Sequence, residues 1–223
     1  MFAMSYPSIY EIADILFNED ECIELLIEKE DRIVPIPGNL AQTLLGLPRD
    51  TFKVLATEID AIVHNAADVY LVEPYAALKS VNVLGTHEVL RLAVTNGFAK
   101  TRVKPVHYIS TGAVFPSTYS APKFMEVADL SKVSDQLDNG YAKSKWVSEQ
   151  MCHETAQRGL PVSSLRPDRS DWFFDMTPVD YAARAIVHFA ASRPVEALCQ
   201  TLHIQKPSLP VKSDVFSRTL LLQ

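Results

Sequence analysis

The 223-residue sequence is poor in glycine and cysteine, and it has no long run of basic or of apolar residues. Its 7 glycines nowhere form the Gly-rich turn with which the start of a helix holds a phosphate group. Its 3 cysteines are odd in number and far apart, which argues against a disulfide framework and against a cysteine metal site. We therefore expect reduced, buried thiols in a cytoplasmic protein.

Charge and hydropathy exclude two classes of partner. The net charge is -6 and the basic residues are not gathered into a run, so nucleic acid is not expected as a partner. No apolar run reaches membrane-spanning length, and the first residues lack the features of a signal peptide, so no membrane partner is expected. No histidine pair has metal-ligand spacing beside a carboxylate, and no metal is expected.

Apolar runs typical of strands alternate with amphipathic segments of helical length. Strands are expected at Arg32–Ile36, Ile59–His64, Pro105–Ile109, Gly159–Pro167 and Thr201–Ile204. Helices are expected at 8–30, Asp50–Glu58, Pro74–Asn96, from Tyr141 onward, and at Asp175–Ser192. This alternation predicts an α/β fold with a doubly wound parallel sheet, whose ligands bind at the carboxyl ends of the strands.

A hydroxyl-bearing turn and a helix with tyrosine and lysine one turn apart indicate proton transfer to a substrate oxygen. Thr111 follows the Pro105–Ile109 strand, while Tyr141 and Lys145 share a helix face because the helix repeats every ~3.6 residues. A phenol titrates near ~10, and a neighbouring ammonium group lowers that pKa toward neutrality. Tyr141 as proton donor, Lys145 as its tuning group and Thr111 as holder of the substrate oxygen suit hydride transfer at a carbonyl carbon.

The Tyr-x-x-x-Lys spacing alone is weak, because a chain with 8 tyrosines produces it by chance about as often as not. A tyrosine at a helix start is also typical of the edge of a core. The stronger observation is that Asn65, Thr111 and Arg166–Pro167 all follow or end predicted parallel strands. The carboxyl ends of such strands meet at one edge, which predicts an active site there.

Several stretches together resemble a known family. They are Ile33–Leu40, Ile59–Ala67, Pro74–Thr86, His107–Thr111, Tyr141–Trp146 and Asp175–Tyr181. In these residues the chain resembles an extended short-chain dehydrogenase/reductase. It is most similar to the thioester reductase domain that ends non-ribosomal peptide synthetases, aminoadipate reductases and carboxylic acid reductases. The resemblance runs from about residue 32 to residue 204 and implies a Rossmann-like sheet.

The resemblance implies roles for individual residues. It implies Thr111, Tyr141 and Lys145 as the catalytic set. It implies a cofactor-binding set of Asn39, Leu40, Asn65, Ala66, Ala67, Asn82, Lys145 and Pro167. Ala66 and Ala67 would line the nicotinamide-ribose side, and Asn82 would support the active-site geometry. Asn39 stands where the family usually has an aspartate on the adenine amine, and its amide carbonyl can accept the same hydrogen bond.

The reaction implied by the resemblance is reduction of a thioester held on a carrier protein by phosphopantetheine. Hydride from NADPH attacks the thioester carbon while Thr111 and Tyr141 stabilise the oxyanion. The thiohemiacetal then collapses to an aldehyde and frees the carrier thiol, and some family members reduce the aldehyde further to an alcohol. The carrier protein is thus the expected partner.

The sequence also departs from this family. The first two strands and the Gly-rich loop between strand and helix are apparently lacking, as is a stretch of about thirty residues after Pro167. We therefore expect residues 1–223 to form a single incomplete Rossmann-like reductase domain. Its parts are a helical segment (1–30), the reductase core (31–204) and a tail (205–223). The Arg32–Ile36 strand would lack neighbours unless it pairs with the Ile59–His64 strand.

Three functional interpretations follow from these features. The chain is a working NADPH-dependent thioester reductase, a truncated and impaired form of one, or a non-catalytic module that keeps the fold remnant for binding a partner. The presence of Thr111, Tyr141 and Lys145 favours an enzyme origin, because a binding role does not need them. The missing phosphate loop favours the truncated form and predicts weak or absent dinucleotide binding.

Overall fold

A parallel sheet forms the centre of the computed structural model, which describes residues 2–3, 34–95, 103–116, 130, 133–167, 173–174, 179–192, 199–204 and 211–212. The sheet has the strand order β3-β4-β5-β7. Its members are β3 (Ile62–His64), β4 (Val106–Ile109), β5 (Val162–Pro167) and β7 (Thr201–Ile204). Every neighbouring pair in it is parallel, as the sequence predicts.

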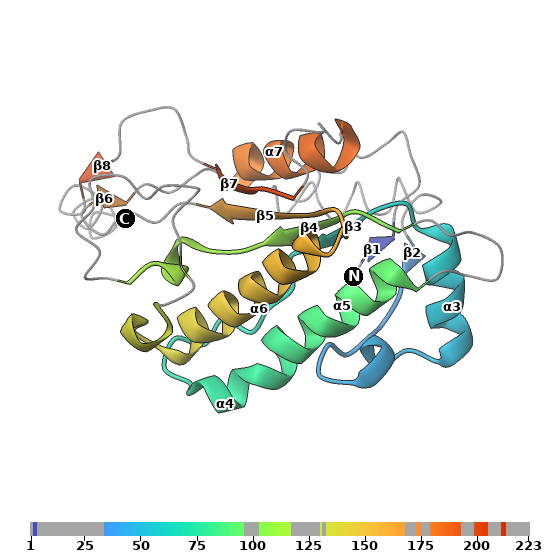
Figure 1. The fold of residues 1–223 in the computed structure, drawn as a ribbon, viewed down its shortest axis with the longest axis horizontal. Helices are drawn as coiled ribbons and strands as arrows, with labels where there is room; N and C mark the ends of the chain where they lie inside the picture. Colours follow the sequence, from blue (N-terminus) through green and yellow to red (C-terminus); the bar gives the residue numbers. More distant parts are fainter. Residues whose placement is uncertain are drawn as a thin grey trace, which may run out of the picture.

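Helices cover both faces of this sheet (Figure 1). They are α3 (Arg49–Glu58), α4 (Tyr75–Leu78), the π-helical segment η3 (Lys79–Leu84), α5 (Gly85–Val94), α6 (Gly140–Gln157) and α7 (Val179–Ser192). Short 3-10 turns are η2 (Thr43–Gly46), η4 (Gly112–Val114) and η5 (Ser134–Gln136). In Figure 1, α7 lies on one side of the strands and α5 and α6 lie on the other. The predicted doubly wound architecture is confirmed.

Alternating residues of each strand supply the two halves of the core. Val106 and Tyr108 of β4 belong to the cluster formed with α3, α5 and α6. Ile109 and Leu165 pack on the other face, against apolar residues of α7 such as Ile186. Full burial of each such side chain contributes about 1.5–3 kcal/mol. Because both faces of β4 are covered, this strand is an almost entirely apolar run in the sequence.

The start of α6 is fixed by a cap and by a close approach. The side-chain oxygen of Asn139 accepts a hydrogen bond from the backbone nitrogen of Ala142 at 2.8 Å, which satisfies one of the free amides at a helix start. A Cβ at Gly140 would lie 2.6 Å from the carbonyl carbon of Pro74, so only glycine lets α6 pass this close to the start of α4. Tyr141 is therefore presented from a rigid position.

The expected strand at Arg32–Ile36 differs from the prediction. Only Val34–Pro35 forms a strand (β2), and it pairs antiparallel with β1 (Phe2–Ala3) outside the parallel sheet. The alternative that it pairs with the Ile59–His64 strand is therefore wrong. Pro35 explains the difference, because proline has no N–H to give to a central ladder.

Some expected features fall outside the described residues. The helix at 8–30, the helix stop at 96–97, the start of the last helix at 175–178 and most of the tail are among them. A second short antiparallel pair, which the sequence did not predict, joins β6 (Phe173–Phe174) to β8 (Val211–Lys212). Within the described part of the chain, none of the helices has the length and apolarity that a membrane span requires.

Candidate active site

The structure brings Thr111 and Tyr141 together at the carboxyl end of β4. Thr111 follows the last strand residues and caps η4, where its hydroxyl oxygen accepts a hydrogen bond from the backbone nitrogen of Ala113 at 3.2 Å. That bond occupies a lone pair and leaves the hydroxyl hydrogen free to be donated. The phenol of Tyr141, in the first turn of α6, lies close enough to the Thr111 side chain for Thr111 to act on its pKa.

Two opposing effects act on the Tyr141 phenol. Burial raises its pKa above the ordinary value, and the Thr111 hydroxyl acts in the opposite direction because it favours the phenolate. The expectation that Lys145 lowers this pKa is not met, since no contribution from the lysine opposes the effect of burial. In the structure Tyr141 is therefore a protonated group suited to donate a proton.

Lys145 is buried and its ammonium group is directed to the strand end. Its Nζ donates a hydrogen bond to the carbonyl oxygen of Ile109 at 2.6 Å and lies 4.2 Å from the ring centroid of Tyr108. Burial lowers the pKa of Lys145 to about 8, while the negative charge of Glu149 opposes that fall. Ile109 is its single hydrogen-bond acceptor among the described residues, which leaves two N–H donors for a ligand.

Asn82 lies in the π-helical segment η3 and joins the loop after β3 to α6. Its side-chain oxygen accepts from the backbone nitrogen of Asp68 at 2.7 Å, and its side-chain nitrogen donates to the carbonyl of Asp68 and to the hydroxyl of Ser144. Its own carbonyl oxygen accepts from Thr86 and from Ser148. Both hydrogens of the side-chain amide are thus used and the residue is 2% exposed, so Asn82 holds the loop after β3 against α6.

The residues after β3 form an exposed loop next to Asn82. Asn65 and Ala66 are exposed and Ala67 is half-buried, while Asp68 is tied to Asn82 through its backbone. Their backbone atoms can be reached by a ligand at the carboxyl edge of the sheet. Pro167, at the end of β5, lies opposite Ile204 of β7 in the ladder.

Asn39 and Leu40 belong to a separate turn before η2. Asn39 is exposed, and its side-chain oxygen accepts from the backbone nitrogen of Ala41 at 2.9 Å. Leu40 packs against Gly85 at the start of α5, where an added Cβ would lie 2.9 Å from the Leu40 Cβ. These residues are therefore anchored to α5 but are not part of the Thr111–Tyr141 cluster.

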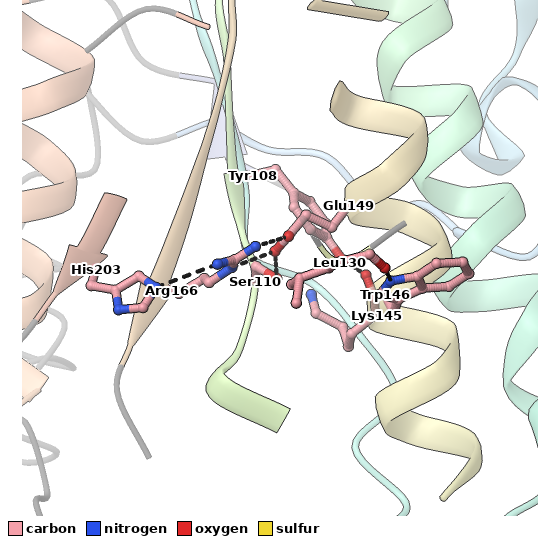
Figure 2. A network of polar contacts seen from close by, with 8 residues as sticks. All are labelled: Tyr108, Ser110, Leu130, Lys145, Trp146, Glu149, Arg166 and His203. Atoms are coloured by element: carbon pink, nitrogen blue, oxygen red, sulfur yellow. Dashed lines mark hydrogen bonds and ion pairs between the residues drawn. The ribbon is translucent and has the colours of Figure 1, made fainter. Parts of the chain in front are cut away.

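A buried ion pair beside the cluster was missed by the sequence reasoning. Glu149 accepts hydrogen bonds from Ser110 and from two nitrogens of Arg166, one of them at 3.0 Å (Figure 2). The remaining guanidinium nitrogen lies 3.4 Å from the Nε2 of His203. The helical spacing was the available signal, because Glu149 follows Lys145 by one turn and shares its face.

His64 is a buried histidine in β3. Its Nε2 is 2.9 Å from the hydroxyl oxygen of Thr86, and that hydroxyl donates its own hydrogen to Asn82 at 2.6 Å. The Nε2 of His64 must therefore carry the hydrogen that Thr86 accepts. Burial, with a smaller contribution from the charge of Lys145, lowers the pKa of His64 to about 3.

This shift predicts a loss of stability in mild acid. The unfolded histidine takes up a proton near 6.5 while the folded one stays neutral down to about 3, so stability falls as the pH drops through that window. The variant His64→Gln keeps an N–H donor for Thr86 but has no histidine to titrate. When the pH falls from about 7.5 to about 5, we expect its free energy of unfolding to decrease by about 2 kcal/mol less than that of the wild type. Urea unfolding at both pH values measures this. The exposed His188→Gln serves as control, and equal losses in all three proteins would contradict the assignment.

The expectation for the cysteines is met at one position and wrong at another. Cys152 is buried against the core, and burial raises the pKa of its thiol to about 12, which makes it unreactive. Cys199 is exposed instead, at a backbone φ of 63, so it does not fill the core as predicted. Cys22 lies outside the described residues.

Comparisons with known proteins agree with this geometry. A model of the NAD-binding family described as male sterility protein matches residues 10–169. The chain is 37% identical over 220 residues to the glycine betaine reductase ATRR of Emericella nidulans, covering 83% of this chain and 17% of that protein. It is 33% identical over 219 residues to a linear gramicidin synthase of Brevibacillus parabrevis, covering 83% of this chain and 4% of that protein.

A solved structure shows the same likeness. The terminal R domain from the myxalamid PKS-NRPS biosynthetic pathway superposes with a TM-score of 0.76 at 36% identity, over 94% of this chain and 57% of that one. The chain thus spans just over half of that domain and a small part of the curated relatives it matches. With its parallel sheet, helices on both faces and the family match over most of its length, the chain belongs to this NAD-binding family of extended short-chain dehydrogenase/reductases, whose cofactor is a nicotinamide dinucleotide.

Proposed function

We propose that the chain carries the catalytic residues of a reductase that reduces an acyl thioester, held by phosphopantetheine on a carrier protein, to an aldehyde or further to an alcohol. NADPH is the proposed hydride donor. The observation that carries the proposal is that Thr111 and Tyr141, one helical turn from Lys145, come together at the carboxyl edge of the parallel sheet. The likeness to reductase domains of peptide synthetases supports it.

In this proposal two hydroxyl groups hold the thioester oxygen. Thr111 is oriented by the backbone nitrogen of Ala113, so that its hydrogen points away from that contact toward Tyr141 or toward a substrate oxygen placed between them. Both hydroxyls then donate to the oxygen as negative charge develops on it, which lowers the barrier. Tyr141, whose pKa burial keeps high, gives up its proton at the end of the step.

The dinucleotide fits one end of this site better than the other. When bound, NADPH supplies the hydride that the thioester carbon accepts. The two unused N–H groups of Lys145 suit the ribose hydroxyls, and the exposed backbone at Asn65 and Ala66 is open to the nicotinamide side. The pyrophosphate has no Gly-rich turn in this sequence, so its donors must come from other residues.

The second candidate function is a non-catalytic module that binds the carrier protein or another partner. The absence of a Gly-rich turn among the 7 glycines of the sequence favours it, because a dinucleotide held by its nicotinamide end alone loses its phosphate contacts. Binding of NADPH separates the two candidates.

The test is calorimetric titration of the 223-residue chain with NADPH, in wild type and Lys145→Ala. The proposal predicts binding that Lys145→Ala weakens by about 10- to 100-fold, because a charge-assisted hydrogen bond contributes about 1.5–3 kcal/mol. Lys143→Ala, in the same helical turn but not directed at Ile109, is the control and should bind as the wild type does. Absence of binding to a folded sample would rule out a working enzyme and leave a truncated reductase or a non-catalytic module.

A further inference from the structure

The Glu149–Arg166 pair is buried beside the proposed catalytic residues but touches none of the atoms that would react. Glu149 lies on α6 and is 2% exposed, and Arg166 lies on β5 and is 3% exposed. Both carboxylate oxygens of Glu149 are used, one by Arg166 alone and the other by Arg166 and Ser110. Figure 2 shows this pair between α6 and the strand ends, with Lys145 on the same side of the helix.

Stability alone does not account for such a pair. Taking two charges out of water costs several kcal/mol for each ion, and apolar side chains of similar volume often fill the same space equally well or better. The guanidinium carbon also lies 4.9 Å from the ring centroid of Phe115, so Arg166 is held from two sides. A charged pair that is this completely fixed is suited to set the orientation of its neighbours.

The Glu149–Arg166 pair is next to two residues of the candidate site, the strand end before Thr111 and the side chain of Lys145. Ser110, which donates to Glu149, is the residue directly before Thr111. Lys145 lies one turn before Glu149 on the same helix face, and its ammonium group donates to Ile109, the residue directly before Ser110. The Glu149 carboxylate therefore contacts the strand end on one side and acts through its charge on the lysine on the other.

We propose that Glu149 and Arg166 are positioning residues, which fix α6 to the ends of β4 and β5 and so hold the Lys145 ammonium against the Ile109 carbonyl next to Thr111. The catalytic role of Lys145 and Thr111 rests on the proposed function, whereas their positioning by this pair does not. The other groups near the ammonium are the ring of Tyr108 and the buried Cys152, together with His64, whose pKa is depressed in part by the lysine charge.

The test reads Lys145 directly and needs neither cofactor nor substrate. Competitive acetylation of the full chain across a pH series, read by mass spectrometry of the peptide containing Lys145, gives the pH at which this amine becomes reactive. In Glu149→Gln the carboxylate charge is lost and Arg166 remains, so the lysine should react at lower pH. A fall of about one unit in its pKa corresponds to roughly fivefold faster labelling near pH 7, given a starting value of about 8.

Two further variants keep the test decisive if Glu149→Gln folds poorly. The double variant Glu149→Gln, Arg166→Met removes both charges at similar volume and should fold, and it should still change Lys145 labelling because the contacts that hold α6 to the strand ends are lost. Glu154→Gln, on the exposed face of the same helix, is the matched control and should label as the wild type does. Unchanged Lys145 labelling in a folded Glu149 variant would overturn the proposal, and so would failure of both variants to fold, since the pair would then be structural.

Discussion

Tyr141→Phe is expected to lower the rate of thioester reduction by about 10²- to 10⁴-fold, the usual contribution of a positioned proton donor. The phenol is the group that Thr111 contacts at the carboxyl end of β4, and burial keeps its proton in place near neutral pH. Affinity for NADPH should change little, because the proposed ribose contact belongs to Lys145. The effect should therefore appear in kcat, measured from NADPH consumption with an acyl-pantetheine thioester.

A matched control is available for this variant. Tyr181→Phe makes the same change at an exposed position of α7 and should leave kcat as it is in the wild type. A kcat of Tyr141→Phe within about threefold of the wild type would contradict the role of Tyr141, since a proton donor in the transition state contributes far more than that.

Gly140→Ala is expected to destabilise the protein more than any other single added methyl group near the site. The new Cβ would lie 2.6 Å from the carbonyl carbon of Pro74 and closer still to backbone atoms of Glu73 and Tyr75. Backbone atoms cannot swing aside as a flexible side chain can, so α6 must move away from α4. We expect a loss of about 1–3 kcal/mol in the free energy of unfolding. Because Tyr141 is the next residue, its approach to Thr111 should also be disturbed.

Urea unfolding measures the first effect, and the fluorescence or NMR signal of the tyrosines reports the second. Lys143→Ala lies in the same helical turn and removes atoms without a backbone clash, so it should stay within about 0.5 kcal/mol of the wild type. If Gly140→Ala were as stable as Lys143→Ala, the close approach of α6 and α4 would not hold in solution.

The sequence predicted the central strand β4 well because this strand is covered on both faces. Val106 and Tyr108 face one layer of helices while Ile109 faces α7, so the segment has almost no polar residue and is easily recognised. The helix from Tyr141 onward was predicted from a local pattern, and the structure adds the cap at Asn139 that fixes its start. The short β2 pairing with Phe2–Ala3 could not be predicted, because no local pattern encodes its partner.

The sequence proposes the members of the candidate site, and they stay a prediction; it does not reveal the electrostatics that the structure shows. The spacing of Tyr141 and Lys145 places them on one helix face, yet it does not reveal that the ammonium is drawn to the carbonyl of Ile109. Burial then raises the pKa of Tyr141, the opposite of what an adjacent lysine alone would do. Likewise, the pairing of Glu149 with Arg166 joins a helix to a strand across a sequence gap, and only the folded sheet brings them together.

The π-helical segment that contains Asn82 is a further feature without a clear sequence signal. A helical pattern was expected through this region, and it is present on both sides as α4 and α5. Within the π-helical turn, the carbonyl of Asn82 accepts from the hydroxyls of Thr86 and Ser148. Such turns are common at functional sites, and here the turn anchors the loop that starts at Asn65 to α6.

The most direct measurement is transfer of deuterium from NADPH labelled at the nicotinamide C4 to an acyl-pantetheine thioester, followed by mass spectrometry of the product. If Thr111, Tyr141 and Lys145 form a reductase site, the wild-type chain yields an aldehyde or alcohol that carries deuterium on the former thioester carbon, and Tyr141→Phe yields little. A folded chain that binds NADPH yet produces no labelled product would contradict the assignment of this site to thioester reduction.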